Sequence, residues 1–192
     1  MRDDLGTPGS DVHAEAERVL AFWFDMLMPE QWFSRASGVD QEIRDRFATL
    51  REEVLANDAA GWREDRRTLL AAILLLDQFS RNIHRRSSEA FAADALAREL
   101  TLQAIDKGWD EGLSREQAQF LYMPLMHAED IECQALSLAK FALLGDEKVQ
   151  AFAREHFQVI ERFGRFPTRN EALGRQSTAA EKDYLSQPGV GW

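Results

Sequence analysis

The sequence LLAAILLLDQFSRNIHR occupies residues 69–85 and changes from apolar to polar about halfway along. Its first eight residues would be apolar on every side of a helix, and such a helix must be enclosed by other elements. Asp77 and Arg81 follow directly on the same helix, so part of this charge must be desolvated and needs partners. Residues 65–85 are therefore predicted to form a central, enclosed helix.

Apolar residues recur at helical spacing along most of the chain, and alternating runs typical of strands are absent. The predicted class is all-α. A chain of 192 residues fits one domain, which we expect at residues 11–192 after a disordered tail at 1–10. The other helices are expected at 11–28, 40–57 with Asp40 as N-cap, 87–108, 114–144 interrupted at Pro124, 147–164, 167–173 and 178–185.

Charge and composition exclude several classes of protein. The chain has 23 basic and 33 acidic residues, a formal charge of −10, which repels nucleic acid and anionic membrane surfaces. We therefore expect neither partner. One cysteine, Cys133, rules out an internal disulfide and fits a reducing compartment. No segment approaches the roughly 20 apolar residues of a membrane span, and residues 1–10 lack the apolar centre of a signal peptide, so a cytoplasmic location is expected.

Three short stretches combine large apolar residues with polar ones that a core normally excludes, and they form the predicted site. They lie in residues 77–85, 121–134 and 162–178. The predicted ligand-binding residues are Asp77, Gln78, Arg81, Asn82, His127, Asp130, Arg162, Arg165, Arg169, Asn170 and Arg175, with Trp32 as a loop tryptophan placed to line a pocket.

His127 follows Pro124, which kinks a helix because it removes a backbone donor. On a continuous helix, His127 and Asp130 share a face. Two interpretations stay open: a histidine held in a structural network, or a general acid and base oriented by Asp130 or Glu129. Metal-ligand spacings such as HExxH and CxxC are absent, so neither a metal nor another cofactor is expected.

The third stretch holds Arg162, Arg165, Arg169 and Arg175 within 14 residues, the one concentrated basic run of an acidic chain. These arginines either pair with carboxylates of neighbouring helices or form an anion pocket, since guanidinium forks match carboxylate and phosphate geometry. A helix start at Pro167 would add free backbone amides.

Three hypotheses of function follow. The first is a binding module whose polar stretches converge on a small anionic molecule or an acidic peptide end. The second is a hydrolase-like or lyase-like enzyme that uses His127 as base with Asp130 or Glu129. The third is a structural scaffold on which a protein partner docks elsewhere.

The same stretches closely resemble the bacterial DUF924 family, whose members read near LLDQFPRNIFR, LYLPFEHSEDL and RFGRFPHRNxxLGRxST. This chain has LLLDQFSRNIHR from Leu74, LYMPLMHAEDI from Leu121 and RFGRFPTRNEALGRQST from Arg162, and VLAFWF from Val19 and AFAADALAREL from Ala90 also match. The resemblance implies a tetratricopeptide-like right-handed array of about seven to nine helices. Four positions depart from the family pattern: Ser80, Met126, Ala128 and Thr168 replace proline, glutamate, serine and histidine.

Overall fold

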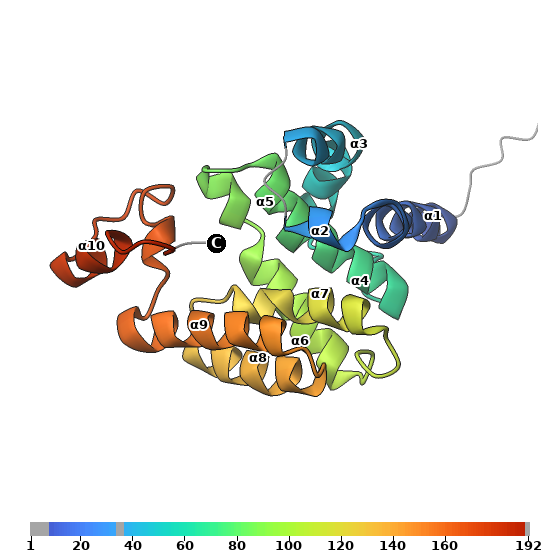
Figure 1. The fold of residues 1–192 in the computed structure, drawn as a ribbon. Helices are drawn as coiled ribbons and strands as arrows, with labels where there is room; N and C mark the ends of the chain where they lie inside the picture. The colour runs from blue at the N-terminus through green and yellow to red at the C-terminus, as the bar shows by residue number, and fades with distance from the viewer. Residues whose placement is uncertain (1–7, 34–36, 191–192) are drawn as a thin grey trace, which may run out of the picture.

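The computed structural model describes residues 8–33 and 37–190, and within these ranges every regular element is a helix (Figure 1). The all-α prediction is confirmed, whereas the tetratricopeptide-like arrangement stays a prediction. Of the expected tail at residues 1–10, residues 1–7 lie outside the described part of the chain. Residues 8–10 form the start of the first helix. In the described ranges no helix has the length and apolar character needed to cross a bilayer.

The helices follow one another with short connections. The α-helices are α1 (Pro8–Leu20), α2 (Pro29–Trp32), α3 (Ser37–Ala56), α4 (Arg66–Leu74), α5 (Ser80–Ile83), α6 (Asp94–Asp106), α7 (Arg115–Met126), α8 (Ile131–Leu143), α9 (Glu147–Phe163) and α10 (Ala179–Leu185). Wider π-helical turns occupy Ala21–Met26 and Leu75–Phe79, and tighter 3-10 turns occupy Ser88–Phe91 and Pro167–Arg169.

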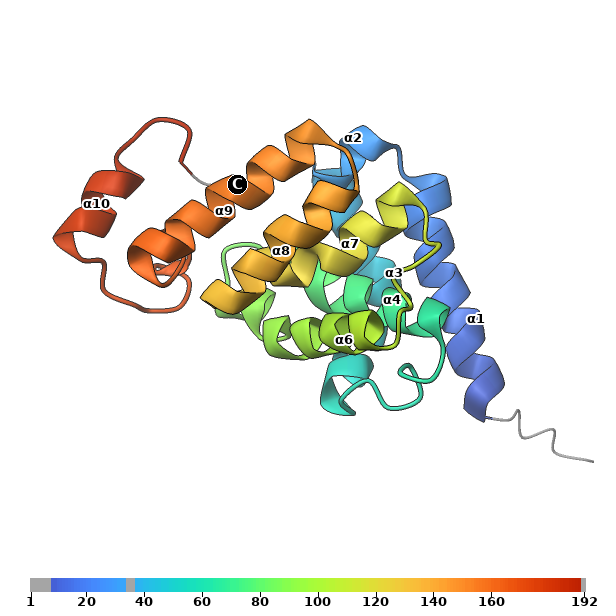
Figure 2. The ribbon, with the colours of Figure 1, turned by 90° about the horizontal axis from the view of Figure 1, so that it is seen from below.

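The predicted central helix is present as one continuous unit of α4, the π-helical turn Leu75–Phe79 and α5. Asp65 caps its start by accepting hydrogen bonds from the backbone N–H groups of Arg67 and Thr68. Helices α1, α3, α6 and α7 pack around it, and Figures 1 and 2 show it in the middle of the molecule. Because the helix is covered on all sides, the π-helical turn places Asp77 in the protein interior.

The chain beyond the core forms a second layer. Helices α8 and α9 lie side by side, and α10 extends past the end of α9 (Figure 2). Gly164 ends α9 with a φ of 69°, a left-handed conformation that glycine adopts without steric cost. The chain then turns back, and Thr178 and Glu181 form the predicted capping box of α10.

Several predicted boundaries are wrong, and Trp32, expected in a loop, is the last residue of α2. The helix expected at 114–144 is two helices, with Pro124 inside α7 and the break at His127–Asp130. The helix expected at 87–108 is a 3-10 turn followed by α6. Asp40 lies inside α3, where its carboxylate pairs with Asn82 and Arg85 in place of capping the helix.

The break between α7 and α8 is held by Gln134, whose side chain is fully buried. Its Nε2 lies 2.7 Å from the carbonyl oxygen of Met126 and 2.8 Å from that of Ala128. Asp130 starts α8 by accepting a hydrogen bond of 2.8 Å from the backbone N–H of Cys133. These bonds satisfy the carbonyl groups that the end of α7 leaves open, and they fix the turn that carries His127.

Gln134→Met should destabilise the protein by about 1 to 3 kcal/mol, because a side chain of similar size would leave buried carbonyl groups without a donor. Urea denaturation measures the loss. Gln158→Met, at an exposed position of α9, is the control and should stay within about 0.5 kcal/mol of wild type. Equal effects of the two substitutions would show that Gln134 does not hold the turn.

Candidate functional site

Asp77 is a buried carboxylate, with a relative exposure of 1%. Its Oδ1 lies 2.7 Å from Nδ1 of His127 and 3.1 Å from Nη1 of Arg81, and its Oδ2 accepts a hydrogen bond of 2.6 Å from Gln78. An ionised carboxylate can only accept, so Nδ1 of His127 carries the proton of this bond. In the neutral imidazole, Nε2 is then an acceptor.

Burial acts against ionisation of Asp77, but the charge of Arg81 and the contact with His127 outweigh it and hold the pKa of Asp77 well below its ordinary value. Burial also lowers the pKa of His127 below 6.5; the carboxylate of Asp77 opposes this shift and Arg81 reinforces it. The pair at neutral pH is therefore an ionised Asp77 and an uncharged His127.

A chain of ion pairs continues from Arg81 to the C-terminal segment. Arg81 binds both carboxylate oxygens of Asp94, at 2.9 and 3.0 Å. Arg169 donates to Oδ2 of Asp94 at 3.0 Å and to the backbone carbonyl of His127 at 2.8 Å. The guanidinium of Arg169 also lies 4.6 Å from the ring centres of Phe91 and Phe166. Burial lowers the pKa of Arg169 to about 10, so it stays charged at neutral pH.

Glu129 forms a second link to the C-terminal segment. Both of its carboxylate oxygens pair with Arg175, at 2.7 and 2.9 Å, and one also accepts the backbone N–H of Phe166 at 2.7 Å. Arg175 donates further to the backbone carbonyl of Phe166 and to Asn170. Although burial opposes ionisation of Glu129, its pairing with Arg175 holds its pKa below the ordinary value.

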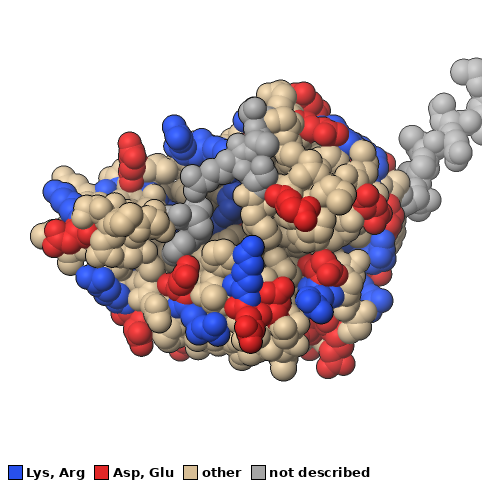
Figure 3. Space-filling model, viewed as in Figure 1, with Lys and Arg blue, Asp and Glu red and all other residues tan. Residues whose placement is uncertain are grey.

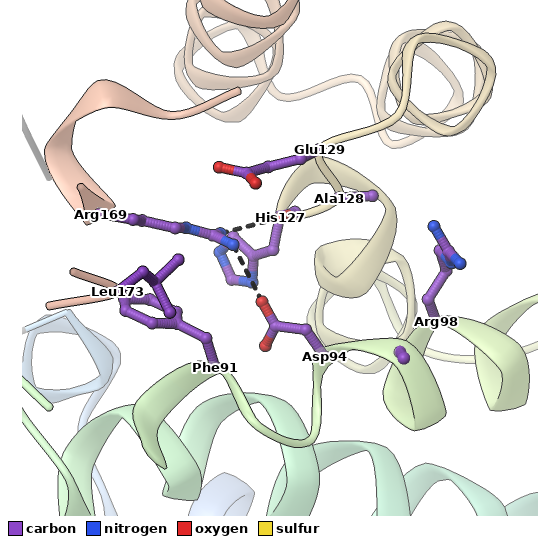
Figure 4. Close-up of a pocket in the computed structure, with 9 residues that line it drawn as sticks. Phe91, Asp94, Arg98, His127, Ala128, Glu129, Arg169 and Leu173 are labelled. Atoms are coloured by element: carbon purple, nitrogen blue, oxygen red, sulfur yellow. Dashed lines mark hydrogen bonds and ion pairs between the residues drawn. The ribbon is translucent and has the colours of Figure 1, made fainter. Parts of the chain in front are cut away.

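These groups surround a cavity of about 280 Å³ between α6, the turn after α7 and the segment after α9 (Figure 4). Figure 4 shows Arg169 and Leu173 on one side, Arg98 on the other, and the ring of His127 with the carboxylate of Asp94 between them. The polar lining residues are Asp94, Arg98, His127, Glu129 and Arg169, and the apolar ones include Phe91, Ala128 and Leu173.

The structure brings part of the predicted site together. His127, Glu129 and Arg169 line the cavity. Directly behind them, Asp77, Gln78, Arg81 and Arg175 hold these groups in place through the bonds described above. All three polar stretches of the sequence therefore contribute to one cavity or to its support.

The other predicted residues point elsewhere. Asn82 donates to Asp40, and Asp130 caps α8. Arg165 pairs with Glu181 and Arg162 is exposed over Phe163. Asn170 is buried, donating to Ser177 and accepting from Arg175. Trp32 donates to the carbonyl of Trp23 and borders a separate hollow of about 370 Å³ beside Phe24 and Asp25.

Two predicted roles need correction. The carboxylate that orients His127 is that of Asp77, in place of Asp130 or Glu129, because the helix ends at Met126 and the expected shared face does not form. The predicted helix start at Pro167 is a single 3-10 turn of three residues. It offers no row of free amides to an anion.

Six residues that line the cavity were not predicted as site residues: Phe91, Asp94, Ala95, Arg98, Ala128 and Leu173. Asp94 and Arg98 are four residues apart in the run AFAADALAREL, whose remaining residues apart from Glu99 are apolar. A helix places such residues on the same face, so this spacing was the signal that could have found them.

The departures from the family pattern have different surroundings. Ala128 lines the cavity, so this chain has no hydroxyl where the pattern has serine. Met126 is buried in the core and Thr168 is exposed. Ser80 is buried and accepts a hydrogen bond of 2.9 Å from Arg51. Among the described residues, no three His, Cys, Asp or Glu side chains are grouped to hold a metal ion.

The fold and the site define an all-helical protein with a small charged cavity. A family model described as a bacterial protein of unknown function, DUF924, matches residues 19–189. The chain therefore belongs to the DUF924 family. It is similar to the solved structure of a protein of unknown function, ATU0120 from Agrobacterium tumefaciens, with 36% identity over 92% of this chain and 99% of that one and a TM-score of 0.87. Comparison with curated proteins finds no match.

His156 on α9 packs against this site, with its ring centre 6.2 Å from that of His127. Burial lowers the pKa of His156 to about 3, and the charges of nearby groups add to the shift. Between pH 6.5 and pH 3 the unfolded chain therefore binds a proton that the folded protein excludes. Stability must fall as the pH falls through this window.

His156→Gln should reduce the pH dependence of the free energy of unfolding between pH 6 and pH 4.5, by up to about 1.4 kcal/mol per pH unit, since it removes one linked proton. Urea denaturation at a series of pH values measures the slope. His13→Gln, at an exposed position, is the control and should keep the wild-type slope. A wild-type slope in His156→Gln would contradict the assignment.

Proposed function

We propose that this protein binds a small anionic molecule, or the acidic end of a peptide, in the cavity between α6, the α7–α8 turn and the segment after α9. The observation that carries the proposal is Arg98. It lines the cavity and, within the described residues, makes no ion pair with a carboxylate. The hydrogen bond from the backbone N–H of Cys133 lowers the pKa of Asp130 and the charge of Arg98 adds to this shift, but the carboxylate of Asp130 is engaged in capping α8.

The charge of the cavity supports an anionic ligand. Its lining and the groups directly behind it hold four guanidinium groups, those of Arg81, Arg98, Arg169 and Arg175, and three carboxylates, those of Asp77, Asp94 and Glu129. This local excess of positive charge occurs in a chain with a formal charge of −10. On the face shown in Figure 3, acidic and basic side chains are otherwise intermingled.

The size and stiffness of the cavity also fit a small ligand. Its volume of about 280 Å³ lies at the lower end of the roughly 300 to 1,000 Å³ of small-molecule sites. Arg169 and Glu129 are each fixed by at least two hydrogen bonds, so these walls need little reordering when a ligand enters. Preorganisation of this kind lowers the free-energy cost of binding.

Replacement of Arg98 tests the proposal. A panel of small carboxylates and phosphates should contain compounds that raise the melting temperature of the wild-type protein. Arg98→Met should weaken their binding by about ten-fold or more, because a charge-assisted hydrogen bond is lost. Calorimetric titration measures the affinity.

Arg154→Met is the matched control, since Arg154 is exposed on α9 outside the cavity and its loss changes the net charge equally. It should bind the same compounds as wild type. Equal affinities in Arg98→Met and wild type, or no anion that binds at millimolar concentration, would refute the proposed function.

A further inference from the structure

His127 presents an unused polar atom to the cavity. Its Nδ1 is bonded to Asp77, and among the described residues no group forms a hydrogen bond with its Nε2. The other polar side chains of the lining are already engaged: Asp94 and Arg169 with each other, and Glu129 with Arg175. Among the described lining residues, Arg98 is thus the charged group without an ion pair, and Nε2 of His127 is a ring nitrogen without a hydrogen bond.

Asp77 determines what His127 can offer. Because the carboxylate accepts the Nδ1 proton, the neutral ring has a lone pair at Nε2 and requires a hydrogen-bond donor there. Asp77 is itself held by Arg81 and Gln78, so neither the ring nor its tautomer is free to change. A ligand that fills the cavity without a donor would leave Nε2 desolvated and unpaired, which costs free energy.

We propose that the ligand is a small hydroxy acid, whose carboxylate pairs with Arg98 and whose hydroxyl group donates a hydrogen bond to Nε2 of His127. The inference rests on the proposed function and specifies the ligand class. Phe91 and Leu173 form the apolar wall that would contact the carbon skeleton.

An ammonium group could also donate to Nε2, but the charges around the ring disfavour it. The titratable groups that face His127 come from four places. They are Asp77 and Arg81 on the central helix, Asp94 on α6, His156 on α9 and Arg169 after α9. Each nearby carboxylate is neutralised by an arginine. An ammonium would therefore meet the two guanidinium groups of Arg81 and Arg169 with no carboxylate left to pair with it, whereas a neutral hydroxyl would not be repelled.

The test compares acids that differ in one group. The probes are lactate, propionate and alanine; phenyllactate, phenylpropionate and phenylalanine; and malate, succinate and aspartate. In at least one set the hydroxy acid should bind wild-type protein on the order of five-fold more tightly than its deoxy analogue, the gain of one neutral hydrogen bond. The amino analogue should bind more weakly than the hydroxy acid. Calorimetric titration at pH 7 measures all the affinities.

His127→Met should abolish the preference for the hydroxyl group while keeping the binding of the deoxy acid, because Arg98 is unchanged. His13→Met, at an exposed position, should keep the preference. Since His127 is buried, wild-type protein labelled with ¹⁵N provides a second readout that needs no variant. The hydroxy acid should shift the Nε2 resonance of His127, and the deoxy acid should leave it nearly unchanged.

The outcomes separate the two proposals. Acids that bind through Arg98 with no preference for the hydroxyl group, or with a preference that His127→Met retains, would overturn the hydroxy-acid inference and leave the anion pocket standing. Tighter binding of the amino analogue would overturn it in favour of a zwitterion. If none of these acids binds, the hydroxy-acid inference fails, and the anion pocket fails with it only if the phosphates of the wider panel do not bind either.

Discussion

The buried carboxylate of Asp77 is the constraint on which the rest of the site depends. It lies in a π-helical turn of the most enclosed helix, where a charge without partners would be strongly destabilising. Its partners come from two places, Arg81 one turn later and His127 at the end of α7. Removing one partner of a buried pair typically costs about 3 to 5 kcal/mol. The carboxylate thus ties the α7–α8 turn to the central helix.

Ion pairs also connect the C-terminal segment to the core. Arg169 and Arg175 follow α9 in the chain, yet their carboxylate partners, Asp94 and Glu129, lie on α6 and on the α7–α8 turn. The segment is therefore held over the core by charge-assisted hydrogen bonds together with the buried ring of Phe166. A small polar cavity lies at this junction.

Much of the fold could be predicted from the sequence, because apolar periodicity and local stop signals act over a few residues. The enclosed helix, the end of α9 at Gly164 and the capping box at Thr178 are of this kind. The break at His127–Asp130 was missed, since it depends on Gln134 and on contacts 50 residues away in the chain. That His127 bonds to Asp77, and to neither of the nearby residues Glu129 and Asp130, also depends on tertiary packing, because Asp77 lies 50 residues away in the chain. The spacing of residues in the sequence therefore predicts several residues of the site, but not which of them form ion pairs or hydrogen bonds with one another.

The protonation state of the His127 ring shows whether Asp77 orients it as the structure indicates. Nitrogen NMR of the ¹⁵N-labelled protein at pH 7 distinguishes a protonated from an unprotonated ring nitrogen. We expect a neutral ring with the proton on Nδ1, bonded to Asp77, and a bare Nε2 facing the cavity. A proton on Nε2, in either the other tautomer or an imidazolium, would contradict this expectation.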